Sequence, residues 1–184
     1  AAGYVIARGY KDFQKKLKTS DRIILFQQEK DNAGDHSCLS YAIDRSGSDM
    51  TLQDVTRAGL SALTKQNKDG FFLMIEGGKI DYACHANDAA TAFKETYDFD
   101  QAIRVAYEFY EQHPDETLIV VTADHETGGM AIGYKTTNYD TFLTNLAHQK
   151  MSYAKFDSTY VNNYMKNQTP FETAMQDVKA NFGL

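Results

Sequence analysis

The sequence predicts an α/β fold built on a largely parallel central β-sheet. Two continuous apolar runs, FFLMI (71–75) and TLIVV (117–121), have the character of strands buried on both faces, which is typical of parallel sheets. The region between them, roughly 86–112, carries apolar residues at helical spacing. A strand, a helix and a second strand in this order indicate a βαβ unit.

The N-terminal part alternates in the same way. GYVIAR (3–8) and RIILFQQ (22–28) are short apolar segments that we expect to form strands. Between them, YKDFQKKLK (10–18) has a helical pattern. A polar, turn-rich stretch follows the second strand.

Two longer helices are expected further along. The first, at 51–67, begins with a capping box in which Thr51 pairs with Asp54, an Asp in place of the usual Glu. The second, in region 86–112, is interrupted at Asp100 and is therefore expected as one helix or two. We expect its apolar stripe to contain Phe93, Tyr97, Ile103, Tyr107 and Tyr110.

The last part of the chain, from Thr136, is rich in Asn, Thr and Tyr and ends in a helix. We expect Thr169 as the N-cap, Pro170 at the first helical position and Glu172 as the partner in a capping box. Gly183 is expected to end the helix.

Composition excludes several classes of function. The 184 residues carry 19 Lys and Arg against 25 Asp and Glu, and the net charge of -6 argues against nucleic acid or an anionic membrane as the main partner. No apolar run approaches the ~20 residues that a membrane-spanning helix needs. Cys38 and Cys84 are expected as buried thiols rather than a disulfide, and no CxxC pair indicates a thiolate zinc site.

The first apolar run leads into IEGGKIDYACHAND (75–88), which brings acids and a histidine together. Asp81 and His85 are four residues apart, so on a helical turn they share a face and make half of a zinc site. Gly77 and Gly78 allow the backbone to bend after Glu76. The alternative is that Asp81 caps a helix and His85 has no special role.

The second apolar run leads into VTADHETGG (121–129). Asp124 and His125 point the same way only if the strand has ended, as Gly128 and Gly129 suggest. A metal ion would offset the cost of placing these groups at the end of a buried strand, although a solvent-exposed strand end remains the alternative. The HExxH protease motif is excluded, because Gly129 stands where the second histidine would be.

Together the two motifs offer three carboxylates and two imidazoles from the carboxyl ends of two strands, where open parallel sheets bind ligands. Oxygen and nitrogen ligands without sulfur suit Zn²⁺ and Mg²⁺. Two metals roughly 4 Å apart can stabilise the attacking and leaving oxygens of a phosphoryl transfer. The candidate metal ligands are Glu76, Asp81, His85, Asp124 and His125.

The stretches GFFLMIEGGKIDYACHAND and IVVTADHETGG closely resemble the alkaline phosphatase family, and YAIDR (41–45) with TLQDVTRAGLSAL after it matches too. The resemblance covers most of residues 1–135 and weakens from Thr136. It implies an α/β/α sandwich around a large central sheet. On this basis residues 1–184 form one partial alkaline phosphatase domain. Residues 1–135 hold the core and the metal motifs, and 136–184 an Asn- and Tyr-rich insertion and a helix.

Members of this family hydrolyse phosphate monoesters with two Zn²⁺ ions, one Mg²⁺ ion and a serine nucleophile that becomes phosphorylated. The resemblance implies that Asp81 and His85 are ligands of the first zinc, which activates the attacking water. It implies that Asp124 and His125 are ligands of the second zinc, which activates the serine, and that Glu76 binds magnesium. Two variable positions, Tyr82 and Glu126, are weaker candidates for the same site.

The resemblance also implies missing parts. No serine lies in the Asp-Ser-Ala type of segment that holds the nucleophile, so no catalytic residue is expected in this chain. His36, His113 and His148 do not match the Gly-His-Thr segment that completes the first zinc site. We therefore expect an internal fragment that starts after the nucleophile and stops before that histidine. Because catalytic zinc usually has three protein ligands, the isolated chain should bind metal weakly or not at all and lack phosphatase activity.

Several expectations concern context. The family is mostly periplasmic or extracellular and often dimeric, and the first residues of this chain carry no signal-peptide pattern. A homodimer and self-association through exposed strand edges are expectations on this basis. Competing functions are a phosphodiesterase, phosphomutase or sulfatase of the same superfamily, and a catalytically silent metal-binding or assembly module. The GGKID and TADHETGG forms favour the phosphatase.

Overall fold

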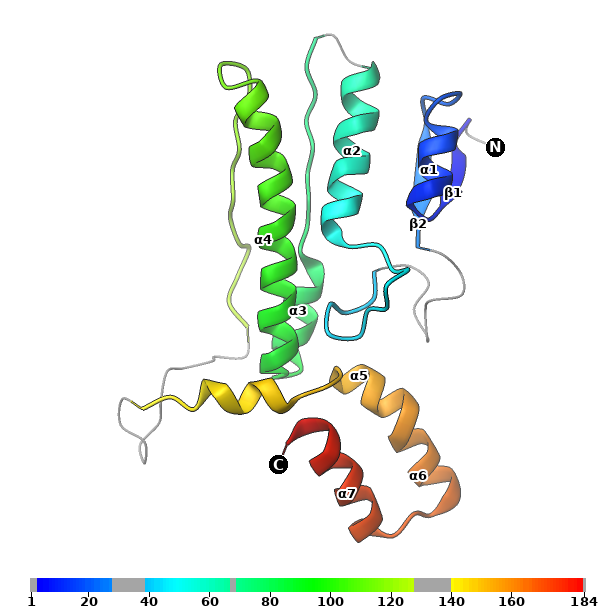
Figure 1. Cartoon of the computed structure of the whole chain (residues 1–184), viewed down its shortest axis with the longest axis vertical. Coiled ribbons are helices and arrows are strands. Elements are labelled where there is room, and N and C mark those ends of the chain that lie inside the picture. The colour runs from blue at the N-terminus through cyan, green and yellow to red at the C-terminus, as the bar shows by residue number, and fades with distance from the viewer. Residues whose placement is uncertain (1–2, 28–38, 67–68, 128–139, 184) are drawn as a thin grey trace.

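The chain has an α/β fold, shown by a computed structural model that describes residues 3–27, 39–66, 69–127 and 140–183 (Figure 1). Its N-terminal unit consists of β1 (Val5–Arg8), α1 (Tyr10–Lys16) and β2 (Ile23–Phe26). The two strands are parallel, and Val5 pairs with Ile23. The strands predicted at 3–8 and 22–28 and the helix predicted at 10–18 are confirmed, with somewhat shorter bounds. Phe13 of α1 is buried with Ala7 of β1 and Ala58 of the next helix.

That next helix, α2 (Leu52–Gln66), begins at the predicted capping box. The Thr51 backbone N–H donates to the Asp54 carboxylate at 2.9 Å, and the Asp54 N–H donates to the Thr51 hydroxyl at 3.1 Å. These reciprocal bonds satisfy two backbone donors that a helix start would otherwise leave unpaired. α2 lies beside the longest helix of the molecule and forms one helical layer with it (Figure 1).

The longest helix, α4 (Ala89–Gln112), is a single helix and continues through Asp100. The predicted apolar stripe is not the buried side of this helix, because Phe93, Tyr97 and Tyr107 are each about half exposed or more. The buried seam instead has alternating spacings of three and four residues, and its first four members are polar. It consists of Asp88, Thr91, Glu95, Asp98, Ala102 and Val105. This seam can be buried because partners elsewhere in the chain satisfy its polar groups.

Two of those partners come from the segment that precedes α2. The guanidinium of Arg45 donates to both carboxylate oxygens of Asp98, at 2.6 and 2.7 Å. The backbone N–H of Ala42 donates to Glu95. Burial raises the pKa of the Glu95 carboxyl, and the Ala42 N–H and the Arg45 charge oppose that rise. Residues 41–50 are therefore fixed on α4 by polar contacts.

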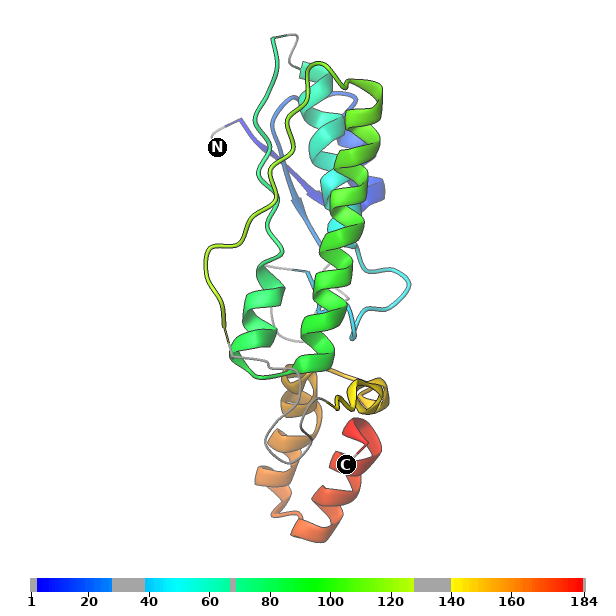
Figure 2. The same ribbon diagram turned by 90° about the vertical axis from the view of Figure 1, so that its left-hand side faces the viewer.

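The two apolar runs predicted as buried strands are extended but unpaired. Phe71 contacts Phe109 of α4, with ring centroids 5.9 Å apart, whereas Phe72 and Leu118 are each 86% exposed. Both segments run along one side of the layer formed by α2 and α4 (Figure 2). The prediction of burial on both faces is wrong for these residues. The described part of the chain supplies no neighbouring strand for them and only one helical layer.

The C-terminal part is helical. It contains η1 (Leu143–His148), α5 (Tyr153–Phe156), the π-helical turn η2 (Asp157–Val161), α6 (Asn162–Asn167) and α7 (Phe171–Phe182). The predicted cap of α7 is displaced by one residue, because Pro170 is the N-cap and no side chain bonds there. Gly183 ends α7 with a left-handed φ of 75°, as predicted. Residues 136–139 lie outside the described part.

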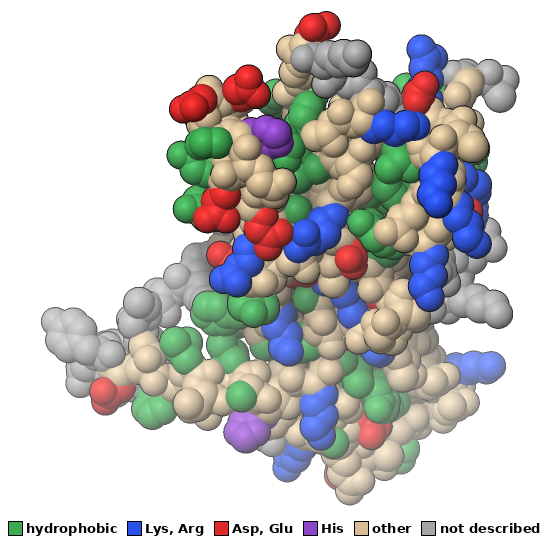
Figure 3. Space-filling model, turned by 45° about the horizontal axis from the view of Figure 1, so that its top comes forward, with side chains coloured by type: hydrophobic (Ala, Val, Ile, Leu, Met, Phe, Trp, Pro, Cys, Tyr) green, Lys and Arg blue, Asp and Glu red, His purple; other side chains and the backbone are tan. Residues whose placement is uncertain are grey.

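The surface carries both signs of charge. In Figure 3, Lys and Arg side chains gather over the N-terminal unit, while Asp and Glu appear mostly elsewhere on this face. No helix among the described residues is long and apolar enough to cross a membrane. Cys84 is a free, half-buried thiol, and Cys38 lies outside the described residues.

Candidate metal centre

A short helix holds the first motif. This helix is α3 (Gly78–His85). Its N-cap is Gly77, and no side chain forms a capping hydrogen bond there. A Cβ atom on Gly77 would lie 3.0 Å from Ile80 and 3.2 Å from the Phe99 ring, so glycine lets α3 pack closely against α4. One turn of this helix brings the side chains of Asp81 and His85 together, as predicted. Asp81 Oδ1 lies 3.3 Å from His85 Nε2.

The second motif lies on the extended segment that follows α4. His125 Nε2 lies 3.4 Å from Asp124 Oδ2 and 3.9 Å from Asp81 Oδ1. The His85 and His125 rings are 6.2 Å apart between centroids. The structure therefore brings four of the five predicted residues together, and Asp81 stands between the two histidines. Their role as metal ligands stays a prediction.

The inner oxygen of Asp81 is unusual. Asp81 Oδ1 is buried and makes no hydrogen bond, although two imidazole nitrogens lie within 3.9 Å of it. A buried carboxylate oxygen normally has a donor, because leaving it unpaired costs free energy. A cation bound to this oxygen would satisfy it. The orphan oxygen and the N/O donor set both fit a zinc ion.

Glu76 stands apart from this group. It is exposed at the end of the first extended segment, and its carboxylate lies beside Gly78. Within the part of the chain that the structure describes, no hydrogen bond or ion pair joins Glu76 to the other four residues. The structure does not bring it into the cluster, and its assignment as a magnesium ligand stays a prediction.

The cluster is not a complete metal cage. Among the described residues, no group of three or more His, Cys, Asp and Glu side chains is arranged to hold a metal ion. Asp81 with His85, and Asp124 with His125, are pairs in contact. The donor chemistry fits two zinc ions, each with two ligands from this chain. Further ligands would have to come from elsewhere.

Electrostatics favour a positive charge at this place. The pKa of His125 is raised by contact of its ring with the Glu126 carbonyl oxygen and, next, by the Asp124 carboxylate. Without metal, this imidazole is therefore protonated up to a higher pH than a free histidine. A metal ion needs the neutral imidazole and so competes with that proton.

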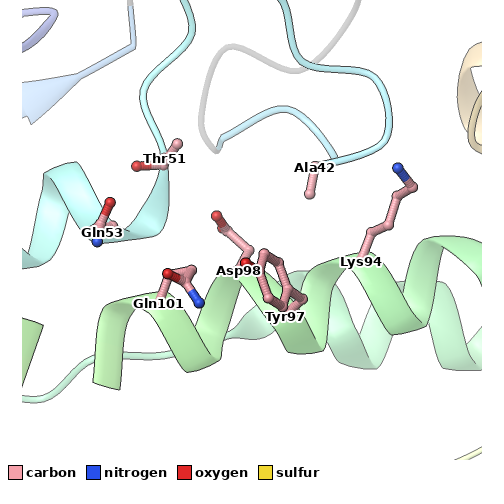
Figure 4. A pocket seen from close by; sticks show the side chains of 7 residues that line it. All are labelled: Ala42, Thr51, Gln53, Lys94, Tyr97, Asp98 and Gln101. Carbon is pink, nitrogen blue, oxygen red and sulfur yellow. The ribbon is translucent and has the colours of Figure 1, made fainter. Parts of the chain in front are cut away.

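A shallow pocket elsewhere is not part of this cluster. It lies between the start of α2, residue 42 and the middle of α4 (Figure 4). Tyr97 and Asp98 of α4 face Thr51 and Ala42 across it. Asp98 already pairs with Arg45, and Lys94 is the other charged side chain that lines this pocket.

Sequence reasoning missed the polar seam of α4. The sequence did contain an indication of this seam, because Asp88, Thr91, Glu95 and Asp98 follow one another at spacings of three and four residues. Acids at such positions normally indicate an exposed face. Only the partners Arg45 and Ala42, far away in sequence, show that this face is buried.

Comparison with known proteins identifies relatives of this chain. A family model described as alkaline phosphatase matches residues 27–182. Alkaline phosphatase 4 of Bacillus subtilis is 46% identical over 95 residues, which cover 52% of this chain and 20% of that protein. The repressible alkaline phosphatase of Saccharomyces cerevisiae is 40% identical over 105 residues, or 54% of this chain and 19% of that protein.

A solved structure gives the same result. The cold-active alkaline phosphatase of a psychrophilic Shewanella matches all of this chain with a TM-score of 0.72 and 29% identity. The match covers 41% of that protein, so this chain spans about two fifths of its length.

Proposed function

Because this chain belongs to the alkaline phosphatase family, we propose that it supplies one part of a metal-dependent phosphate monoester hydrolase. In this proposal it holds half of each of two zinc sites and one ligand of a magnesium site. The serine nucleophile and the remaining ligands come from polypeptide outside this sequence. An extracellular or periplasmic location belongs to the same proposal.

One observation carries the proposal. Two segments that are distant in sequence bring His85 and His125 within ion-pair distance of Asp81, whose buried oxygen has no hydrogen-bond donor. Buried carboxylate oxygens usually have a hydrogen-bond donor, so the unpaired oxygen supports a site for a cation. The family match also encloses both segments.

The residues of this chain have separable roles. When bound, two Zn²⁺ ions activate the attacking oxygen and stabilise charge on the phosphoryl group. Asp81 and His85, on one face of α3, hold the ion that activates water. Asp124 and His125 hold the ion beside the nucleophile. Glu76 provides a carboxylate for Mg²⁺, which prefers oxygen ligands.

A chimera tests this function in a complete protein. The matching 41% of the Shewanella enzyme is replaced by this chain, and hydrolysis of p-nitrophenyl phosphate is measured. We expect the chimera to be active, and the variants His85→Ala and His125→Ala to lose activity by about 100-fold or more. His113→Ala is the matched control, because His113 lies at the other end of α4 and should leave activity unchanged.

Three outcomes would contradict the proposal. A folded His85→Ala chimera with full activity would show that this residue is no ligand. Faster hydrolysis of p-nitrophenyl sulfate or bis(p-nitrophenyl) phosphate would favour a sulfatase or phosphodiesterase. A folded, zinc-loaded chimera without any turnover would favour the catalytically silent module.

A further inference from the structure

The corner between α3 and α4 has a defined backbone geometry. The N–H of Asp88 donates to the Ala83 carbonyl and the N–H of Asn87 to the Cys84 carbonyl, both at 2.9 Å. Asn87 has a left-handed φ of 54°. This pattern is a Schellman motif, and it ends α3 immediately after His85. The candidate ligand His85 is therefore separated from Asp88 by only two residues.

The Asp88 carboxylate joins this corner to the C-terminal helices. Asp88 is buried, with 7% of its surface exposed. Its Oδ1 accepts from the Thr91 N–H at 3.3 Å and from Gln149 Nε2 at 2.6 Å. Its Oδ2 accepts from the Tyr153 N–H at 2.9 Å. One buried charge thus holds α4, residue 149 and the start of α5 in one arrangement.

α3 needs an external support of this kind. It is only eight residues long and has no side-chain cap at its start, and helices of this length are not stable alone. The His85 side chain is 64% exposed, and its described polar contact is with Asp81 on the same helix. The direction of His85 therefore depends on how α3 is held, both by its packing on α4 and by the corner that follows it.

We propose that Asp88 is a positioning residue for the candidate metal centre. Its buried carboxylate fixes the α3–α4 corner against residues 149–153, and this places His85 opposite His125. The inference rests on the proposed function for its metal and on the described contacts for its geometry. In this inference, the C-terminal helices support the first zinc half-site through their contacts with Asp88.

Asp44 provides a matched control. Its carboxylate accepts from the Ser152 N–H at 3.0 Å and from the Ser152 hydroxyl at 2.5 Å. It holds the same C-terminal helices from the segment before α2, and its side-chain hydrogen bonds go to Ser152 and not to Asp88 or α3. Replacing Asp44 should loosen these helices without moving His85 directly.

The experiment compares Asp88→Ser and Asp44→Ser in the full chain. Serine keeps an N-cap acceptor for α4 but is too short to reach Gln149 and Tyr153. Circular dichroism sets a temperature at which both variants are folded. Zn²⁺ affinity is then measured by calorimetry, and the imidazole signals of His85 are recorded by NMR without metal.

We expect Asp88→Ser to lower Zn²⁺ affinity about 10-fold, as loss of a group that orients a ligand typically does. Its His85 signals should move in the metal-free protein, whereas Asp44→Ser, which loosens the C-terminal helices but keeps the Asp88 bonds, should change both measurements much less. Equal behaviour of the two variants, or unchanged His85 signals in Asp88→Ser, would overturn the inference. If the isolated parent binds no measurable Zn²⁺, as two half-sites allow, the metal-free His85 signals alone test the role of Asp88, and the chimera tests the proposed function.

Discussion

Two carboxylates of this chain, Asp98 on α4 and Asp81 on α3, differ in how their oxygens are paired. The Asp98 side chain is 10% exposed and forms a two-point ion pair with Arg45. Asp81 is 37% exposed, yet its buried oxygen has no donor and faces two histidines. The first carboxylate has a partner for both oxygens within the chain, whereas one oxygen of the second has no hydrogen-bond donor. In the proposed function, this difference separates a charge that fixes the fold from a charge that is placed for a metal ion.

The strongest test of this contrast is Arg45→Met. The variant leaves Asp98 buried without its cation, so we expect the free energy of unfolding to fall by about 3–5 kcal/mol. Urea denaturation measures this loss. A loss below about 1 kcal/mol would show that the pair does not hold residues 41–50 on α4.

The double variant Arg45→Met, Asp98→Leu sharpens the result. Removing both charges avoids the unpaired carboxylate, and replacement of buried ion pairs by apolar residues is often neutral. We expect urea denaturation to show a double variant that is clearly more stable than the single one. If both variants lose the same free energy, packing by the Arg45 side chain, and not its charge, carries the effect.

Asp81→Asn should behave differently. Because Asp81 has no hydrogen-bond donor at its buried oxygen and its two histidine contacts are largely exposed, we expect its loss to change the free energy of unfolding by less than about 1 kcal/mol. The variant should nevertheless lose any increase in melting temperature that Zn²⁺ gives the parent. Thermal unfolding with and without Zn²⁺ checks both statements, and a loss as large as that of Arg45→Met would contradict the contrast.

The smallest expected effect is a change in titration. The raised pKa of His125 means that the folded state favours the protonated ring. This contribution to stability is therefore full below the unfolded value of about 6.5 and is lost as pH rises through the folded pKa. Asp124→Asn removes one cause of the shift, so NMR titration should find a lower His125 pKa. Zn²⁺ affinity should rise with pH over the same range, because zinc needs the neutral ring. An unchanged pKa in the variant would show that Asp124 does not act on His125.

Local patterns predicted the local elements. The capping box of Thr51 and Asp54, the spacing of Asp81 and His85, and the strand of residues 3–8 depend on neighbours in sequence, so they could be predicted from it. The proximity of the two motifs followed from a topological rule about strand ends. It was found although the segments before the motifs are not paired strands.

Features that depend on distant partners were not predictable. The exposed aromatic residues of α4 looked like a core stripe, and the acids of its true buried seam looked like a solvent face. Arg45 decides the second case from 53 residues away. The exposure of residues such as Phe72 and Leu118 was likewise not predictable, because it follows from the absence of a neighbouring strand among the described residues.

Calorimetric titration of the isolated chain with Zn²⁺ tests the central claim most directly. The parent is compared with a His85→Ala, His125→Ala double variant and with His113→Ala, and p-nitrophenyl phosphate is assayed in parallel. Two half-sites predict weak binding in the parent and in His113→Ala, no binding in the double variant, and no turnover in any of them. Binding that survives in the double variant, or tight binding with turnover in the parent, would contradict the account.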